Sequence, residues 1–221
     1  MLTLFFVDSE LETIPEEMWK DDAVTQLSKK RKKKPGNLLL DSSLLHRSID
    51  AYFPSSSKRR GRPDIFHILL NVLNSSIINI LGELSVFIHT RNDILIKVNP
   101  ETRIPKSYNR FAGLMEQLFE LGEIRSGEDV LFSTEKKSAI ESIKSYGSGK
   151  VTVMWPSGEH VSRNNLVEAR DQTFVIGGFT SGDYISDLSH IGRRVSIFDQ
   201  ELTIWTVAGE IIAAYETYMG L

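Results

Sequence analysis

The 221-residue sequence contains no cysteine, and this absence excludes several kinds of site at once. Without a thiol there is no disulfide framework, no thiolate metal site and no cysteine nucleophile. The histidines are few and scattered, and none stands at the spacing of a paired metal ligand: His46, His67, His89, His160 and His190. We therefore predict no metal site. The lack of cysteine is also typical of the cytosol, where thiols stay reduced.

Long apolar runs are missing as well. No stretch reaches the roughly 18 apolar residues that a membrane helix needs. The first residues, MLTLFFVDSELE, carry no basic leader and turn acidic at once. We therefore expect neither a membrane span nor a signal peptide, and we expect a cytoplasmic protein. A hydrophobic content of 41% over 221 residues is enough for one substantial α/β core, so a single main domain is expected.

A strong excess of one charge is also absent, since the formal net charge is −3. The basic residues are nevertheless clustered. Lys29 to Lys34 reads KKRKKK, and Lys58 to Arg62 reads KRRGR. Such clusters bind phosphate backbones through charge neutralisation and counterion release. Because Pro35-Gly36 follows the first cluster at once, we interpret that cluster as a solvated linker. The second cluster stands directly before a helix start and is a candidate binding segment.

Strand and helix patterns alternate along the chain. We predict strands over residues 2–7, 37–40, 84–89, 94–98, 150–155, 173–176 and 194–197. We predict helices over residues 15–27, 63–81, 111–121, 134–146 (capped by Thr134) and 202–218. The strands at 84–89 and 94–98 are joined by a short turn and form a small inserted hairpin. The alternation predicts an α/β fold with a mainly parallel sheet covered by helices on both faces.

The stretch from Thr173 to Tyr184, TFVIGGFTSGDY, runs from a buried strand into a glycine-rich turn. Three glycines leave backbone N–H and C=O groups free to reach a ligand directly: Gly177, Gly178 and Gly182. Neither a P-loop nor a dinucleotide fingerprint is present, because Asp183 and Tyr184 follow where Lys and Ser or Thr are needed and the glycine spacing differs. Two interpretations stay open: a glycine turn without a ligand, or a site for a ligand without phosphate, such as a cation.

Arg59, Arg60 and Arg62 stand beside Asp64 at the start of the helix that Pro63 opens. Guanidinium groups suit phosphates and base edges, and the helix end adds free N–H groups and partial positive charge. Asp64 is equally suited to stabilise the first turn of its own helix, so both roles stay open.

The stretch from Asn99 to Arg110 places Arg103, Lys106 and Arg110 in a proline-punctuated loop with Tyr108 among them. Basic groups with an interleaved aromatic ring are typical of sites for single-stranded or looped RNA, where the ring stacks on bases and the cations hold phosphates.

Four blocks, in this order, carry a family resemblance: RRGRPDIFH, VFIHTRNDILIKVNPETRIPKSYNRFAGLMEQL, FVIGGFTSGDY and VSIFDQELTIWTVAGEI. They resemble the pseudouridine methyltransferases of small-subunit ribosome biogenesis, which occur in archaea and eukaryotes and belong to the knotted SPOUT class. The resemblance covers nearly the whole chain. It is to the archaeal type, since long eukaryotic extensions are absent.

The resemblance implies one SPOUT domain over residues 1–221, with a family-specific insertion around residues 42–110 and a C-terminal trefoil knot. It implies a homodimer that uses S-adenosyl-L-methionine to methylate a ring nitrogen of one pseudouridine in small-subunit ribosomal RNA. Ribosomal proteins or assembly factors are further partners compatible with it. The closing helix agrees with a dimer, because it carries more apolar residues than one helix face hides: Ile204, Trp205, Val207, Ile211, Ile212, Tyr215 and Met219.

The resemblance also implies site residues. The cofactor-binding set is Met154, Trp155, Gly177, Gly178, Gly182, Ile197, Phe198, Asp199, Gln200, Glu201 and Leu202. Where relatives carry a polar-aromatic-proline run, this chain has Phe198 to Glu201, so backbone contacts are expected there. The RNA-binding set is Arg59, Arg62, Arg103, Lys106 and Arg110.

Asp64 and Arg62 are the candidate catalytic residues. The pseudouridine ring nitrogen must lose a proton, and a nearby cation such as Arg62 lowers its pKa. We expect Asp64 to orient the target base rather than act as a general base, because a carboxylate flanked by three arginines is a weak base.

Two alternative functions are compatible with parts of the sequence. A non-catalytic assembly factor that binds ribosomal RNA would keep the basic segments but would not need three cofactor loops. A SPOUT methyltransferase acting on transfer RNA would share the knot but would have no use for the TRIPKSYNRF block.

Overall fold

Eight strands form one sheet in the computed structural model, which describes all of residues 1–221. In chain order the strands are β1 (Leu2–Ser9), β2 (Leu84–Thr90), β3 (Ile94–Val98), β4 (Glu123–Ser126), β5 (Asp129–Lys136), β6 (Lys150–His160), β7 (Gln172–Gly177) and β8 (Arg193–Ser196). The helices are α1 (Asp22–Arg31), α2 (Ser42–Tyr52), α3 (Pro63–Asn74), α4 (Ile77–Ile80), α5 (Tyr108–Leu121), α6 (Ala139–Tyr146) and α7 (Ile204–Met219).

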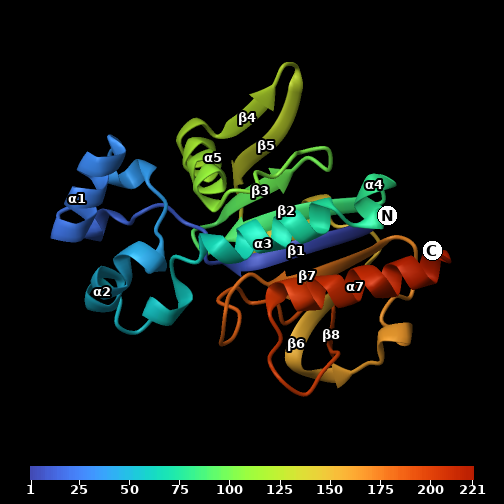
Figure 1. Ribbon diagram of the computed structural model, residues 1–221. Coiled ribbons are helices and arrows are strands. Elements are labelled where there is room, and N and C mark those ends of the chain that lie inside the picture. The colour runs from blue at the N-terminus through green and yellow to red at the C-terminus, as the bar shows by residue number, and fades with distance from the viewer.

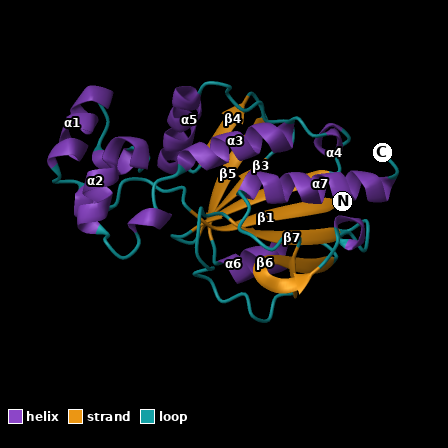
Figure 2. Ribbon diagram, turned by 60° about the horizontal axis from the view of Figure 1, so that its bottom comes forward, coloured by secondary structure: helices purple, strands orange, loops and turns teal.

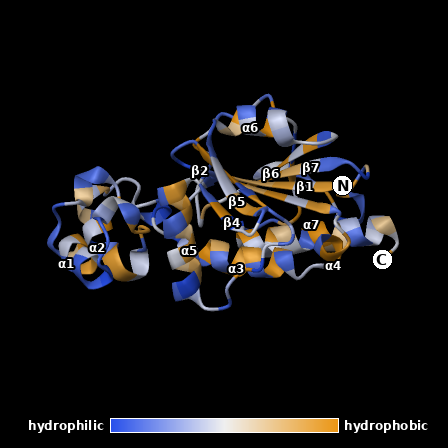
Figure 3. Cartoon of the chain, turned by 90° about the horizontal axis from the view of Figure 1, so that it is seen from above, coloured by the Kyte–Doolittle hydropathy of each residue, from blue (hydrophilic) through white to orange (hydrophobic).

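The sheet order is β4-β5-β3-β2-β1-β7-β6-β8. The run β2-β1-β7-β6-β8 is parallel throughout, whereas β3, β5 and β4 continue the sheet in antiparallel pairs. Helices cover both faces: α6 lies on one side, and α3, α5 and α7 lie on the other (Figures 2 and 3). The predicted fold class, a mainly parallel sheet between helices, is therefore confirmed.

Strand β1 lies in the middle of the sheet, and its alternating side chains build two cores. Leu4 and Phe6 point into the large apolar cluster beneath α3 and α7, while Phe5 and Val7 point into the smaller cluster beneath α6. This is the period-two alternation of a strand buried on both faces. The parallel strands end toward the α1–α2 side of the molecule, and both chain termini lie at the opposite end of the sheet (Figure 1).

Helices α1 and α2 form a separate lobe beside the sheet (Figure 1). We call residues 14–53 the α1–α2 lobe. It has its own apolar cluster, made by Ile14, Met18, Val24, Leu38, Leu40, Leu45 and Ile49. Contacts between side chains tie the lobe to α5, among them those from Lys33 Nζ to Glu116 Oε2 and from Asn37 Nδ2 to Glu120 Oε1, each 2.7 Å long.

Two secondary-structure predictions for this lobe were wrong. Residues 37–40 join no sheet, and only an isolated bridge pairs Leu39 with Thr13. A short apolar run cannot by itself distinguish a strand from a segment that fills a small core. The helix predicted over residues 15–27 begins only at Asp22, because the Asp21 carboxylate accepts hydrogen bonds from the N–H groups of Ala23 and Val24.

The KKRKKK cluster is not a linker as a whole. Lys29, Lys30 and Arg31 form the last turn of α1, where basic side chains interact favourably with the helix dipole. Lys32 then ends the helix in the left-handed conformation, with a φ of 55°.

Two predicted helices needed correction elsewhere. The helix over residues 63–81 is broken at Ser75 and Ser76, whose hydroxyls bond back to the carbonyls of Asn71 and Leu73, and Ser76 then caps α4. Thr134 does not cap a helix but lies in β5; α6 starts at Ala139, after a capping box of Ser138 and Glu141. The β4–β5 hairpin was missed because its exposed side lacks a clear apolar alternation.

Candidate cofactor and RNA site

A pocket lies where β6, β7 and β8 end, at the carboxyl edge of the parallel sheet. It encloses about 710 Å³, including its open mouth. Its walls come from three segments and one helix: residues 154–156 of β6, where the pairing with β8 shifts register, residues 176–184 of the glycine stretch, residues 195–202 at and after the end of β8, and Ile204 and Val207 of α7. Ligand sites of open α/β sheets lie at this edge.

The structure brings together most of the predicted cofactor residues. Those that line the pocket are Met154, Trp155, Gly177, Gly182, Ile197, Phe198, Gln200, Glu201 and Leu202. Gly178 and Asp199 do not line it. A Cβ on Gly178 would lie 2.1 Å from Ser9 Oγ, so this glycine allows the loop to pack against β1. The Asp199 side chain is 94% exposed and points to solvent.

Sequence reasoning overlooked the aromatic wall of the pocket. The Tyr184 ring lies 5.0 Å from the Trp155 ring and 5.3 Å from the Phe179 ring, and its hydroxyl donates to Met154 O at 2.9 Å. Burial raises the pKa of Tyr184, so this hydroxyl keeps its proton and its bond. The bond joins the glycine loop to the middle of β6. The signal available in the sequence was the presence of Phe179 and Tyr184 inside the glycine-rich turn.

The loop beyond the pocket is fixed by a buried carboxylate. Asp8, at the end of β1, accepts hydrogen bonds from Ile185 N at 2.7 Å, Ser186 N at 2.9 Å and Ser186 Oγ at 2.7 Å. Asp8 has a φ of 56°, a left-handed conformation that aspartate tolerates better than most residues. Asp8 thus fixes the segment that directly follows the glycine stretch of the pocket wall.

The charge of the pocket lining is one-sided. Asp183 and Glu201 are its only ionisable acids, and no lysine, arginine or histidine is among the lining residues. Such a lining repels phosphate and favours a cation, which agrees with the second interpretation of the glycine stretch.

Elsewhere, no group of three or more His, Asp or Glu side chains is arranged to hold a metal ion. None of the helices is both long and apolar enough to span a bilayer.

The two candidate catalytic residues form an ion pair at the start of α3. Arg62 Nε and Nη2 donate to the two carboxylate oxygens of Asp64, both at 2.8 Å. This hydrogen bonding raises the pKa of Arg62. The Asp64 carboxylate is therefore engaged by a permanent cation, which suits a residue that orients a base better than one that accepts a proton.

Arg59 and Arg60 point inward rather than to solvent. Arg60 lies 3.0 Å from Glu12 Oε2 and stacks 3.9 Å above the Phe53 ring, so it binds the α1–α2 lobe to the sheet. The Arg59 guanidinium lies 4.0 Å above the Phe179 ring and donates to the carbonyl of Asp183. Arg59 Nε and Nη2 are buried without a hydrogen-bond partner, so these two donors do not face the solvent side where RNA would lie.

The other basic residues predicted to bind RNA lie on the β3–α5 loop and in the first turn of α5. Arg103, Lys106 and Arg110 are exposed, between β3 and the first turn of α5. The loop is fixed to α3, because Asn74 Nδ2 bonds Thr102 O at 2.7 Å and His67 Nε2 lies 2.7 Å from Pro105 O. Because the Arg62–Asp64 ion pair stands at the start of α3, this helix contacts the β3–α5 loop and also carries the ion pair.

Tyr108, whose place among basic residues suggested a stacking role, is half-buried and points to the α1–α2 lobe. Its hydroxyl donates to the carboxylate of Asp41 at the start of α2, and its ring lies 5.9 Å from the His67 ring. Burial and the Asp41 charge raise the pKa of Tyr108. Tyr108 therefore ties the loop to the α1–α2 lobe.

The sheet, with a pocket built from three loops at the carboxyl ends of its parallel strands, defines an α/β protein of the SPOUT methyltransferase class. The crystal structure of Archaeoglobus fulgidus Nep1 bound to S-adenosylhomocysteine has the same fold, with a TM-score of 0.88 and 29% identity over 99% of each chain. The chain belongs to the EMG1/NEP1 methyltransferase family, whose sequence model matches residues 4–216. This confirms the family resemblance found in the sequence.

Curated relatives match the chain over its full length. The ribosomal RNA small subunit methyltransferase Nep1 of Thermoplasma acidophilum is 48% identical over 221 residues, which is 100% of both chains. The protein of the same name from Thermococcus onnurineus is 41% identical over 224 residues, covering 99% of this chain and 100% of the relative.

Proposed function

We propose that this protein is an S-adenosyl-L-methionine-dependent methyltransferase of small-subunit ribosomal RNA, and that its target is a ring nitrogen of one pseudouridine. The observation that carries the proposal is the pocket at the strand ends, which has two carboxylates and no basic group in its lining. Full-length relatives named as small-subunit ribosomal RNA methyltransferases support the RNA substrate, and a structural neighbour bound to S-adenosylhomocysteine supports the cofactor.

The residues present fit such a cofactor. Its sulfonium is a cation without phosphate, which the Asp183 and Glu201 carboxylates favour. When bound, the cofactor supplies a methyl group activated by positive sulfur. Backbone groups of residues 154–155, 177–182 and 197–202 would hold it, and the Trp155 and Tyr184 rings would exclude water. The protein's main task is then to align the reacting atoms.

We propose that the Arg62–Asp64 pair binds and orients the target base. A cation near the pseudouridine ring favours the deprotonated ring nitrogen, which is the nucleophile. Asp64 holds the Arg62 guanidinium through two hydrogen bonds, and its remaining acceptor capacity faces solvent, since its side chain is 45% exposed. We propose that Asp64 orients the base and the cation together.

The experiment that tests this function uses three RNA substrates: a transcript of small-subunit ribosomal RNA made with uridine, the same transcript made with pseudouridine throughout, and bulk transfer RNA. Each is incubated with the protein and methyl-labelled cofactor, and the product is mapped by mass spectrometry. We expect label at one position of the pseudouridine transcript and none in the uridine transcript. Label in bulk transfer RNA instead would favour the transfer RNA enzyme, and RNA binding without label would favour the assembly factor.

The first prediction concerns the cofactor loop. Gly178→Val places a side chain against Ser9, since even a Cβ would lie 2.1 Å from Ser9 Oγ, and the glycine loop must move away from β1. We expect S-adenosylhomocysteine affinity, measured by calorimetry, to fall at least about tenfold, or about 1.4 kcal/mol. Gly113→Ala is the matched control, because a Cβ at Gly113 meets no atom within 4 Å. Undiminished binding by Gly178→Val would remove this loop from the cofactor site.

We also propose a homodimer, but through a different surface from the one the closing helix suggested. Ile204, Ile211, Ile212 and Tyr215 are buried within their own chain, against the core under α3. Six of the exposed apolar side chains lie instead on α3, on or directly after α4, and at the end of α7: Ile68, Val72, Ile77, Ile80, Leu81 and Tyr218. Ile80 is 75% exposed. Exposed apolar side chains on neighbouring helices are typical of a subunit interface.

The second prediction tests that interface. Light scattering of the unmodified protein at micromolar concentration should give twice the chain mass of 25.0 kDa. The double variant Ile77→Asp/Ile80→Asp places two charges on the apolar surface and should give the single-chain mass. Leu121→Asp changes an exposed residue at the end of α5 and should leave the dimer intact. A single-chain mass for the unmodified protein would exclude the dimer.

A further inference from the structure

Glu10 is a buried carboxylate between the glycine loop of the cofactor pocket and the Arg59–Asp64 segment. Neither the proposed cofactor contacts nor the proposed base contacts involve Glu10. It directly follows β1 and is 1% exposed. Its carboxylate accepts hydrogen bonds from Thr180 N at 3.2 Å and from Thr180 Oγ1 at 3.3 Å. Its N–H donates to Gly178 O at 3.0 Å. Glu10 is thus bonded to the glycine loop, of which Thr180 lines the pocket.

The other side of Glu10 holds the segment that leads into α3. The carbonyl of Glu10 accepts a hydrogen bond from Arg62 N at 3.0 Å. The side chains of Arg59 and Arg62 supply the positive charge near the buried carboxylate, and burial raises the pKa of Glu10. One residue therefore contacts the backbone of both the pocket loop and the candidate catalytic arginine.

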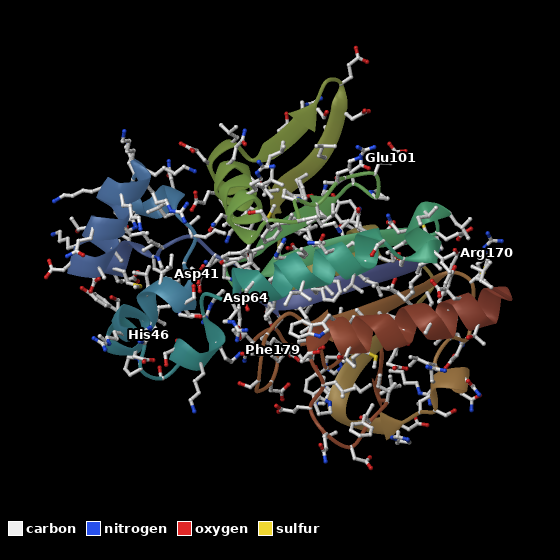
Figure 4. All side chains as sticks on the ribbon, in the orientation of Figure 1. Asp41, His46, Asp64, Glu101, Arg170 and Phe179 are labelled. Atoms are coloured by element: carbon white, nitrogen blue, oxygen red, sulfur yellow. The ribbon has the colours of Figure 1, made fainter.

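Two further contacts join the same segments. Thr180 Oγ1 lies 3.2 Å from Lys58 O, and the Arg59 guanidinium stacks on Phe179 and bonds Asp183 O. Phe179 and Asp64 lie at the same end of the sheet, on neighbouring segments (Figure 4). These contacts join the glycine loop directly to residues 58 and 59.

Burying a carboxylate is costly unless its oxygens are hydrogen-bonded. An apolar residue at position 10 would avoid this cost, but it could not bind Thr180. The arrangement fits a residue that fixes the relative position of two binding segments, and two sites are coupled when one element biases both.

We propose that Glu10 is a positioning residue which holds the glycine loop and the Arg59–Asp64 segment in one arrangement, so that cofactor and RNA strengthen each other's binding. This rests on the proposed function, because it needs both ligands. The coupling is reciprocal: the factor by which RNA raises cofactor affinity equals the factor by which cofactor raises RNA affinity.

The test measures that factor. Calorimetry gives the affinity for S-adenosylhomocysteine with and without a saturating amount of the pseudouridine transcript, and the ratio of the two is the coupling factor. For the unmodified protein we expect a ratio of at least about 5, the lower end of typical couplings. Glu10→Ala removes the bonds to Thr180 and should bring the ratio close to one. Because a ratio cancels a uniform loss of affinity, it separates positioning from a merely weakened pocket.

Two further variants serve as a matched control and as a second test. Glu116→Gln changes another buried carboxylate, on α5, which pairs with Lys33 and contacts neither the glycine loop nor the Arg59–Asp64 segment, so its ratio should stay that of the unmodified protein. Thr180→Val keeps the size of the side chain but removes the hydroxyl, and should lower the ratio even if Glu10→Ala fails to fold.

An unchanged ratio in Glu10→Ala, or in Thr180→Val where Glu10→Ala does not fold, would overturn the inference. So would a ratio near one in an unmodified protein that methylates its RNA, and in both cases the proposed function would stand. An unmodified protein that neither binds S-adenosylhomocysteine nor transfers a methyl group would remove the proposed function and the inference together.

Discussion

Asp64→Ala should lower the single-turnover rate of methyl transfer by roughly 100-fold, the size of effect that a small misplacement of reacting groups produces. The reason is geometric. Without the carboxylate, the Arg62 guanidinium loses both of its 2.8 Å hydrogen bonds and no longer has a fixed orientation toward the base. RNA affinity should change much less, because the removed charge is negative and makes no favourable contact with phosphate.

The stability of Asp64→Ala distinguishes this role from a purely structural one. The Arg62 and Asp64 side chains are 36% and 45% exposed, so their pairing contributes at most about 1 kcal/mol. If Asp64 only supported the first turn of α3, the melting temperature would fall while turnover per folded molecule stayed nearly normal. Single-turnover rates measured beside melting curves decide between the two.

A control for the helix dipole is available in the α1–α2 lobe. Asp22 is also an exposed first-turn aspartate, at the start of α1. Asp22→Ala should cost the same few tenths of a kcal/mol of dipole interaction and leave methyl transfer unchanged. A stable and fully active Asp64→Ala protein would take Asp64 out of the site.

The parallel core could be predicted from the sequence because its strands are buried on both faces and read as continuous apolar runs. β1 and β7 are of this kind, and β7 runs into a turn marked by glycine. The same rule failed at residues 37–40, where an equally apolar run fills the core of the α1–α2 lobe instead. Periodicity reports burial, and only the tertiary partner decides the backbone conformation.

The site was predictable to a similar extent. Backbone-lined loops have a glycine signature, so Gly177 and Gly182 were found, and the family resemblance located the other two loops. Gly178 shows the limit of that signature: glycine is needed there for contact with Ser9 and not for the pocket. Arg59 and Tyr108 show another limit, because the types of neighbouring residues do not reveal which way a side chain points.

Glu10 could not be found from one sequence at all. A glutamate after a strand is usually a solvated residue, and nothing in DSELE distinguishes the carboxylate that Thr180 binds from the one that Arg60 binds. Its partners come from segments about 50 and 170 residues away, so its position depends on the completed fold.

Removing the arginines of the β3–α5 loop should produce the largest change in RNA binding. Arg103 and Arg110 are exposed and make no ion pair within the chain, so their charge is available to phosphates. For single-stranded RNA each phosphate contact contributes about 0.7 to the slope of log K against log salt, which is about fivefold in affinity at about 0.1 M salt.

The double variant Arg103→Ala/Arg110→Ala should therefore bind the pseudouridine transcript roughly 25-fold more weakly at that salt concentration, with a slope smaller by about 1.4. S-adenosylhomocysteine affinity in the absence of RNA should stay unchanged, because neither arginine lines the pocket. Arg125→Ala serves as the control: Arg125 is an exposed arginine on β4 whose guanidinium already pairs with Glu123 at 2.8 Å, so its loss should leave the salt slope as it is. If the slope of log K against log salt is unchanged in the double variant, RNA binds elsewhere. A parallel loss of cofactor affinity would mean that the loop supports the pocket rather than the RNA, and titrations at several salt concentrations distinguish these results.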